Sequence, residues 1–327
     1  MFDIDYHWYR KSHSFLGFTL LPLSLLFGAI IRTRRALYRS GIKKVFTAPV
    51  PVIVVGNITV GGTGKTPLVI WLANFLQEQG FRPGIISRGY GGDGKLKLVD
   101  QNADPKACGD EAVLIARRTL RPVVTGVNRV TALKKILAET DTDIVISDDG
   151  LQHYSLGRHL EIAMVDGERR FGNQSLLPAG PLREPLSRLQ QVDFVVTQKN
   201  PVAAEYTMRL EGDELVALAD ATAVKRLQDF YGAKVHAVAA IGNPSQFFSR
   251  LRAQGLSIIE HVFPDHHYFK AEDLDFDDDL PVIMTEKDAV KCQGSGKSNH
   301  WYLPVSAQMS TQFSENILKK IGVTSHG

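Results

Sequence analysis

Apolar runs of four to seven residues alternate with longer amphipathic stretches through most of the chain. Eight runs have the length and the β-branched content typical of buried strands. These predicted strands cover residues 51–56, 83–87, 122–125, 143–147, 161–165, 193–197, 235–241 and 281–285. Helical stretches lie between them, for example Asp110 to Thr119 and Arg129 to Thr140. Such alternation predicts an α/β protein whose mostly parallel sheet is covered by helices on both faces and places ligands beyond the carboxyl ends of its strands.

The N-terminus departs from this alternation. Phe15 to Ile31 form a run of seventeen residues without charge, interrupted by Pro22. No small-residue cleavage site follows, which argues against a cleaved signal peptide. The length is at the lower limit for crossing a bilayer, so a spanning helix, a buried core helix and a helix in the membrane interface all stay open. We favour the interfacial helix, with aromatic residues such as Trp8 and Phe18 in the acyl boundary.

Composition and charge narrow the class of protein. The chain has 327 residues, 44% of them hydrophobic, which is enough for a large core and two domains. Two cysteines, Cys108 and Cys292, argue against a disulfide scaffold. The net charge is +3, yet the first fifty residues carry +6, which suits an anionic membrane surface. Nothing in the sequence indicates a nucleic acid or an obligate protein partner.

The predicted organisation has four parts. Residues 1–45 form a membrane-associated helical segment, 46–200 a nucleotide-binding core, 201–230 a hinge and 231–327 a smaller C-terminal α/β domain. Within the hinge, residues 208–219 are predicted to form a connecting hairpin around Glu211-Gly212-Asp213.

A phosphate-binding loop follows the first predicted strand. Its residues are Thr59, Val60, Gly61, Gly62, Thr63, Gly64, Lys65 and Thr66. Glycines let successive backbone N–H groups turn toward an anion, and the following helix N-terminus favours negative charge. Lys65 is placed to reach the β- and γ-phosphates and Thr66 to ligate Mg²⁺, so the loop predicts ATP and Mg²⁺ as cofactors. Thr59 stands where the usual pattern has its first glycine.

Two further segments carry candidate phosphate and metal groups. Asp148 and Asp149 follow an apolar strand, where phosphate-loop enzymes place a second magnesium-binding element. A solvated turn is the alternative for this pair. The proline-bounded loop 176–185 offers Arg183 and Glu184, which could clamp a phosphate or a metal.

Two residues are candidates for acid–base chemistry. Asp110 stands at a predicted helix start, where it is most simply an N-cap. His266 lies in a histidine-rich segment with His261 and His267, whose spacing lacks a fourth metal ligand. An acid–base or orienting role is favoured over metal binding there, and a surface position is the plainer alternative.

Together these segments resemble the tetraacyldisaccharide 4'-kinase family of lipid A biosynthesis, a family with a P-loop nucleotide kinase-like fold. The resemblance covers nearly the whole chain and rests on residues 51–66, 86–91, 109–111, 147–153, 176–185 and 263–266. It implies ATP- and Mg²⁺-dependent transfer of the γ-phosphate to the 4'-hydroxyl of a tetraacylated disaccharide 1-phosphate. The family usually has Thr at the position of Thr59, whereas Ala112 stands where many members have Pro.

The same resemblance implies roles for single residues and a place in the cell. Asp110 and His266 match the catalytic Asp/His pair, with Lys65 and Arg183 on the phosphates. Thr66, Asp148, Asp149 and Glu184 are the metal candidates, and the N-terminal helix makes the membrane contact. The expected location is the cytoplasmic face of the inner membrane, against an acylated lipid substrate.

Two other classes are weighed against the kinase. A GTPase would need a guanine-reading [NT]KxD motif, and Thr285 to Asp288 has these residue types in the wrong order. A membrane-targeted P-loop ATPase acting on a partner protein is the more serious rival. It would use the loop and the basic N-terminus but would not need Asp110 or His266.

Overall fold

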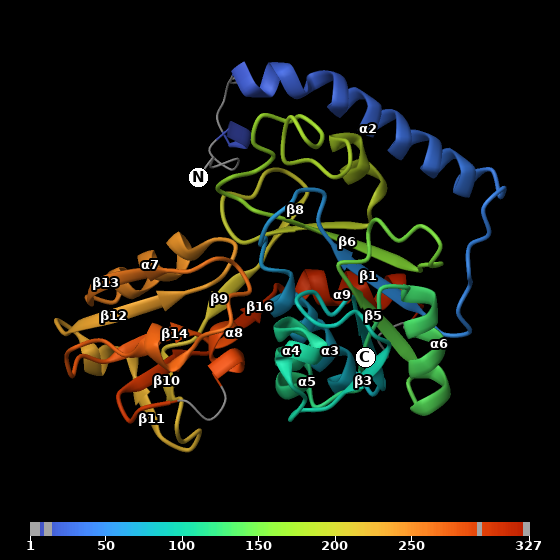
Figure 1. Cartoon of the computed structure of the whole chain (residues 1–327). Coiled ribbons are helices and arrows are strands. Elements are labelled where there is room, and N and C mark those ends of the chain that lie inside the picture. The colour runs from blue at the N-terminus through green and yellow to red at the C-terminus, as the bar shows by residue number, and fades with distance from the viewer. Residues whose placement is uncertain (1–6, 10–14, 293–295, 323–327) are drawn as a thin grey trace.

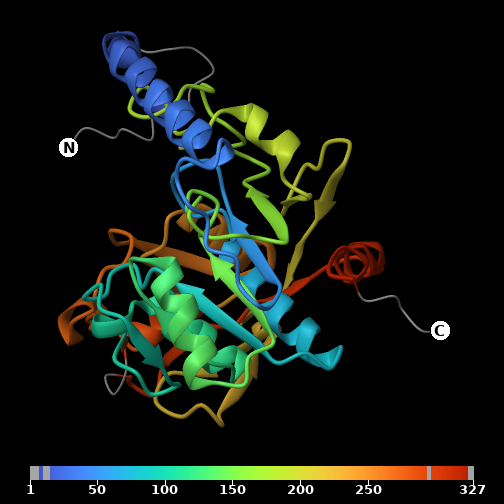
Figure 2. The same cartoon turned by 90° about the vertical axis from the view of Figure 1, so that its right-hand side faces the viewer.

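Two separate sheets organise the chain into two lobes, and a long N-terminal helix lies across the end of the first lobe (Figure 1). This computed structural model describes residues 7–9, 15–292 and 296–322. Seen from the side, the long helix projects from the body at the top (Figure 2).

The first lobe is built on an eight-stranded sheet. In spatial order the strands are β3 (Lys97–Val99), β4 (Val123–Thr125), β2 (Pro83–Ser87), β5 (Ile144–Asp148), β1 (Val52–Gly56), β6 (Leu160–Val165), β7 (Phe194–Thr197) and β8 (Glu205–Thr207). All neighbours pair in parallel except β3, which runs antiparallel to β4 at the edge. The predicted mostly parallel sheet is therefore confirmed, and its central strands read as continuous apolar runs because both faces are buried.

Helices cover both faces of this sheet. They are α3 (Lys65–Glu78), α4 (Pro105–Cys108), α5 (Asp110–Thr119), α6 (Arg129–Glu139) and the 3-10 helix η1 (Leu186–Gln191). One apolar core includes Leu72 of α3 and Ile115 of α5, and the other includes Leu133 of α6. The C-terminal helix α9 (Thr311–Lys320) belongs to the first of these cores, because Phe313 packs against Trp71 and Phe194.

The second lobe has a six-stranded mixed sheet. Its order is β11 (Val224–Arg226), β10 (Glu214–Ala217), β15 (His300–Leu303), β14 (Val282–Thr285), β12 (Lys234–Ala239) and β13 (Ser257–Val262). The helical segments of this lobe are η2 (Leu227–Phe230), α7 (Pro244–Ala253), η3 (Ala271–Leu274), α8 (Glu286–Ala289) and η4 (Val290–Cys292). β12, β13, β14 and β15 pair in parallel, so this lobe too has strand ends that meet at one edge.

The predicted hairpin at residues 208–219 is wrong. β9 (Arg209–Glu211) pairs with β16 (Ser306–Gln308), whereas β10 pairs with β11 and β15. The short turn between β9 and β10 therefore separates two sheets instead of closing one hairpin. A hinge in this region stays a prediction, and β9 with β16 forms the two-stranded ribbon by which the chain leaves and re-enters the first lobe.

The long helix α2 (Phe15–Arg39) presents small residues to the protein and large apolar residues outward. Gly17, Ser24 and Gly28 are buried, and the Ser24 hydroxyl donates to the Leu176 carbonyl at 2.5 Å. Phe15, Leu25, Leu26 and Ile30 are more than half exposed. A helix at the edge of a soluble core would bury its large apolar residues, so this arrangement argues against the core-helix alternative.

One aromatic residue of the predicted interfacial segment contacts the first lobe. The Trp8 indole N–H donates to the carbonyl of Pro178 at 2.9 Å. Trp8 is half-buried, and its place in the acyl boundary stays a prediction.

Candidate active site

The loop between β1 and α3 has the backbone that an anion site needs. Gly61 and Gly64 adopt φ of 94° and 83°, and α3 begins at Lys65 directly after the left-handed Gly64. The φ of Gly64 is one that residues with a Cβ rarely adopt, so glycine is favoured there by backbone conformation. Thr59 forms an antiparallel bridge with Leu182. Because its backbone is extended and paired, this first position of the loop does not require glycine.

Lys65 lies in a cluster of charges at the carboxyl end of β1 and β5. Its Nζ is 3.4 Å from Oδ1 of Asp149 and donates to Oδ1 of Asn57 at 3.2 Å. Arg183 donates to the other oxygen of Asp149 at 3.0 Å. These two cations hold the pKa of Asp149 well below its usual value, although burial opposes them. Lys65, Arg183 and Asp149, predicted separately, thus lie together.

Asp148 is buried beside them in a different environment. One of its oxygens accepts from the Ser87 hydroxyl at 3.1 Å, and Arg129 donates to its backbone carbonyl at 2.9 Å. Burial, Glu111 and Asp149 raise the pKa of Asp148 to about 7. Arg129, a fully buried cation at the start of α6, was missed in the sequence; its place after β4 at the carboxyl edge is the only signal that could have found it.

The two aspartates fit a hard cation. Oδ1 of Asp148 is buried without a hydrogen-bond partner among the residues described, and Oδ1 of Asp149 has only the ion pair with Lys65 at 3.4 Å. Adjacent carboxylates repel unless a cation lies near both, and carboxylate and hydroxyl oxygens suit Mg²⁺. In the same described ranges, no group of three or more His, Cys, Asp or Glu side chains is arranged to hold a metal alone. A magnesium ion here would therefore need phosphate or water oxygens as further ligands, as is usual for this metal.

Glu184 has other partners. Its two carboxylate oxygens accept from Gln152 at 3.0 Å and from Tyr154 at 2.7 Å, and Arg188 lies 3.4 Å away. The side chain is completely buried. Its role as a metal ligand stays a prediction. The two hydrogen bonds and the charge of Arg188 would favour a carboxylate at this position even without a metal.

Asp110 and His266 lie in contact across the two lobes. His266 Nδ1 is 3.0 Å from both oxygens of Asp110. Burial acts to raise the pKa of Asp110, but His266, Lys287 and Lys291 outweigh it and lower the pKa below its usual value. An ionised carboxylate can only accept, so Nδ1 carries the hydrogen of this bond.

The helix start at Asp110 differs from the prediction. Gly109, at φ of 86°, is the N-cap, and Asp110 is the first helical residue, whose Oδ1 accepts from the backbone N–H of Glu111 at 2.8 Å. Without the capping role, both oxygens of Asp110 remain turned toward His266.

A glycine-rich loop joins the two clusters. Ser87 at its start contacts Asp148, and the ring of Tyr90 lies 4.7 Å from that of His266. The hydroxyl of Tyr268 donates to the carbonyl of Gly91 at 3.0 Å. The loop 87–92, most of which lies in the segment 86–91 that carries the family resemblance, therefore connects the magnesium candidates with the Asp110–His266 pair.

The lobes also meet at the phosphate loop. A Cβ on Gly242, in the segment after β12, would lie 2.8 Å from the backbone nitrogen of Gly62. Arg169 donates to the Gly62 carbonyl at 3.0 Å and to that of Gly242 at 3.5 Å. Sequence reasoning missed Arg169, because nothing in its local pattern indicates a contact with a loop more than 100 residues away.

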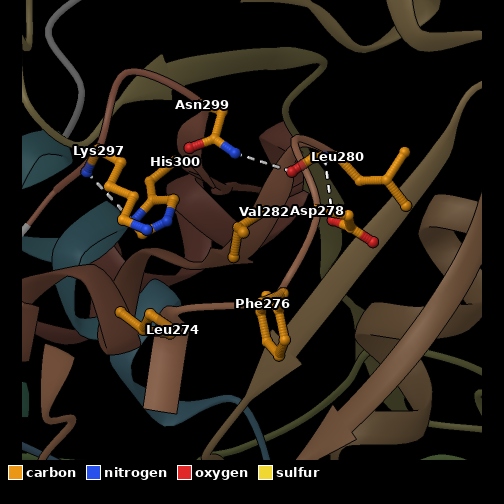
Figure 3. Close-up of a pocket in the computed structure, with 8 residues that line it drawn as sticks. All are labelled: Leu274, Phe276, Asp278, Leu280, Val282, Lys297, Asn299 and His300. Carbon is orange, nitrogen blue, oxygen red and sulfur yellow. Dashed lines mark hydrogen bonds between the residues drawn. The ribbon is translucent and has the colours of Figure 1, made fainter. Parts of the chain in front are cut away.

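The remaining histidines of the second lobe have separate partners. His261 contacts His236 at 2.8 Å, and His267 contacts Asp273 at 2.9 Å. A cavity near His236 has a volume of about 10 Å³, room for about one water molecule, and shares no residue with either cluster (Figure 3). Its lining residues are Leu274, Phe276, Asp278, Leu280, Val282, Lys297, Asn299 and His300.

Comparisons with known proteins show which family the chain resembles. The family described as tetraacyldisaccharide-1-P 4'-kinase matches residues 16–322. A tetraacyldisaccharide 4'-kinase of Nitrosococcus oceani is 50% identical, over 95% of this chain and 92% of that protein, and one of Alkalilimnicola ehrlichii is 48% identical, over 94% and 93%. The crystal structure of LpxK from Aquifex aeolicus in complex with ATP superposes with a TM-score of 0.79 at 29% identity. That match covers 94% of this chain and 99% of the other.

Proposed function

The chain belongs to the tetraacyldisaccharide-1-P 4'-kinase family, and we propose that its two side-chain clusters form one site for phosphoryl transfer to the 4'-hydroxyl of a tetraacyldisaccharide 1-phosphate. The protein is a kinase of lipid A biosynthesis that binds ATP. The contact between His266 and Asp110 carries the proposal, because a phosphate loop alone would also serve an ATPase.

The phosphate end of the site consists of the loop 59–66 with Lys65 and Arg183. Backbone N–H groups of a loop that ends at a helix N-terminus bind phosphate oxygens. Lys65 and Arg183 both pair with Asp149 here, so their charges are already directed at one point. Phosphoryl transfer depends mostly on positioning and on neutralising charge, which these cations supply.

Thr66, Asp148 and Asp149 are the residues that we propose hold Mg²⁺. The buried Oδ1 of Asp148, which has no hydrogen-bond partner among the residues described, supports this assignment, as does Oδ1 of Asp149, which has only the ion pair with Lys65. A magnesium ion held by these residues would supply positive charge against the phosphate oxygens during transfer. Ser87 and Arg129 orient Asp148 through its side chain and its carbonyl.

Asp110 serves as the general base in this proposal. The oxygen of a sugar hydroxyl bonds to the γ-phosphorus as the bond from that phosphorus to ADP breaks, ADP leaves, and the hydroxyl proton passes to a carboxylate oxygen of Asp110. The lowered pKa keeps this carboxylate ionised at neutral pH, and the Nδ1–H of His266 fixes its direction. General-base help of this kind contributes on the order of 10² to 10⁴ in rate.

The helix α2 brings the enzyme to its substrate at the membrane. Its outward face is apolar, and Arg34 and Lys43 line a surface hollow of about 420 Å³ together with Ile30 and Leu37. Over residues 17–39 the helix is long and apolar enough to cross a membrane, and 17% of that window is buried. We propose that α2 holds the enzyme at the cytoplasmic face of the inner membrane, where cations meet anionic headgroups.

The test is transfer from γ-labelled ATP to a detergent-dispersed tetraacyldisaccharide 1-phosphate. We expect labelled lipid from the wild type and none from Lys65→Ala, with Asp110→Ala reduced on the order of 10² to 10⁴. ATP hydrolysis without labelled lipid at any acceptor concentration would instead support the membrane-targeted ATPase.

A further inference from the structure

The short helical segment of α8 and η4 packs against α5, and the proposed function gives none of its residues a part in the reaction. The segment, Glu286 to Cys292, follows Thr285 and includes Lys287 and Asp288 of the scrambled guanine-reading motif. Two of its lysines, Lys287 and Lys291, are four positions apart. Both reach the N-terminus of α5 from the opposite lobe.

Lys291 is the more unusual of the two. Its side chain has no exposed area, and its Nζ lies 2.7 Å from Oδ1 of Asp288 and 3.8 Å from Oδ2 of Asp110. The ring of Phe269 lies 5.4 Å from the same nitrogen. Burying an ammonium group is costly unless carboxylates compensate it, and Asp288 and Asp110 are the two carboxylates near this nitrogen.

Asp288 is fixed independently of Lys291. Its Oδ2 accepts from the hydroxyl of Thr285 at 2.6 Å and from the backbone N–H of Ala240 at 3.1 Å. Ala240 directly follows β12. Asp288 thus holds the Lys291 ammonium group at the second lobe. The other carboxylate near this group is that of Asp110, on the first lobe.

We propose that Lys291 is a positioning residue for the reaction, whose buried ammonium keeps the Asp110 carboxylate ionised and turned toward His266. This inference rests on the proposed function, in which Asp110 is the base. The base lies on one lobe and the cation that supports it on the other, so the site is complete only when the two lobes are in contact.

The other titratable groups around Asp110 do not supply the buried positive charge that Lys291 supplies. They are His266 and Tyr268 from the segment after β13, Lys287 from α8 and Glu111 from α5 itself. The Nζ of Lys287 lies 3.0 Å from Glu111 and 3.4 Å from Asp265, so two other carboxylates share its charge. Lys106 of α4 lies over the ring of Tyr268, 5.8 Å from its centre, at the rim of this group.

The experiment removes the buried pair as a unit. In Lys291→Met with Asp288→Asn no unpaired carboxylate is left next to the new side chain, which avoids the main cost of breaking a buried ion pair. Lys291→Gln serves as the second variant if the double variant does not fold. The matched control is Lys297→Met with Asp275→Asn, the same chemical change at an exposed pair.

Three quantities are measured on each full-length enzyme: ATP affinity, kcat for lipid phosphorylation from pH 3 to pH 9, and the unfolding midpoint. We expect unchanged ATP affinity, and the acid limb of the kcat profile moved upward by about one pH unit, since loss of a neighbouring cation raises a carboxylate pKa. The pKa of Asp110 lies below its usual value, so the fall in kcat relative to wild type approaches about tenfold only at the most acidic pH values, and the deficit disappears toward neutral pH. The control keeps the wild-type profile.

A lowered unfolding midpoint with an unchanged pH profile would overturn the inference, because a purely structural lysine would behave in that way. Asp110→Ala and His266→Ala are assayed beside these variants. If both of them transfer phosphate at the wild-type rate, the proposed site itself fails, which is a different result from an unshifted Lys291 profile.

Discussion

The imidazole Nδ1 of His266 lies 3.0 Å from both carboxylate oxygens of Asp110, although 156 positions separate the two residues in the chain. Asp110 begins a helix of the first lobe, and His266 follows a strand of the second. Their contact means that the proton acceptor and the group that orients it are brought together only when the lobes meet. Several consequences can be measured.

Replacing His266 should remove catalysis and leave nucleotide binding intact. In His266→Ala we expect kcat for lipid phosphorylation to fall on the order of 10² to 10⁴, because Asp110 loses its orienting donor. ATP affinity, measured by calorimetry, should stay within about twofold, since no loop residue changes. The control is His267→Ala, whose ring contacts Asp273 instead. Wild-type transfer by His266→Ala would show that the pair is structural only.

Gly109 should be irreplaceable at the entry to α5. It has φ of 86°, and a Cβ there would lie 2.4 Å from the carbonyl oxygen of Tyr90. Gly109→Ala should therefore displace the loop that carries Tyr90, lower the unfolding free energy by at least about 2 kcal/mol and reduce transfer. Gly80→Ala is the control that has the backbone strain without a steric clash, because Gly80 has φ of 87° and a Cβ there would have no other atom within 4 Å. It should cost about 1 kcal/mol and keep activity; equal losses in urea denaturation would contradict this account.

Acid should destabilise the protein partly through His153. Burial and the charges of Arg129, Arg34 and Arg88 lower the pKa of His153 from 6.5 to about 4. Between these values the unfolded chain takes up a proton that the folded protein does not, so stability falls as pH falls from 6.5 to 4. The ring is partly exposed, and we expect an effect on the order of 1 kcal/mol between pH 7 and pH 5.

The measurement is urea unfolding at both pH values for the wild type and for His153→Gln. The variant should lose less stability on acidification than the wild type does. If the two proteins lose the same amount, His153 takes up its proton equally well in the folded state.

Charges on the outer face of α2 should release the enzyme from membranes without unfolding it. Leu25 and Ile30 are 73% and 57% exposed, so Leu25→Asp with Ile30→Asp should change stability by no more than about 0.5 kcal/mol per substitution. Co-sedimentation with vesicles containing anionic lipid should fall strongly. Tyr231→Asp, at a site 79% exposed on the other lobe, is the control. If all three proteins sediment equally with the vesicles, α2 is not the membrane anchor.

Local pattern determined much of this protein. The bounds of β2 and α5 agree with the predicted residues 83–87 and 110–119, because strand and helix periods and helix ends are written in a few adjacent residues. The phosphate loop could be predicted for the same reason, since its glycines, Lys65 and Thr66 act within one turn of chain. Parallel topology then placed Asp148 and Asp149 at the same edge of the sheet as this loop.

Tertiary structure decided what depends on distant segments. β9 and β10 look like one hairpin, yet they pair with β16 and β15, because the partners that complete each sheet come 84 to 99 residues later. The ammonium of Lys291, the guanidinium of Arg129 and the ring of His266 acquire their roles from the carboxylates and carbonyls that they meet. Such roles are set by charge and burial in three dimensions. The periodicity of the sequence does not predict these roles, although it does predict which face of a strand or helix is buried.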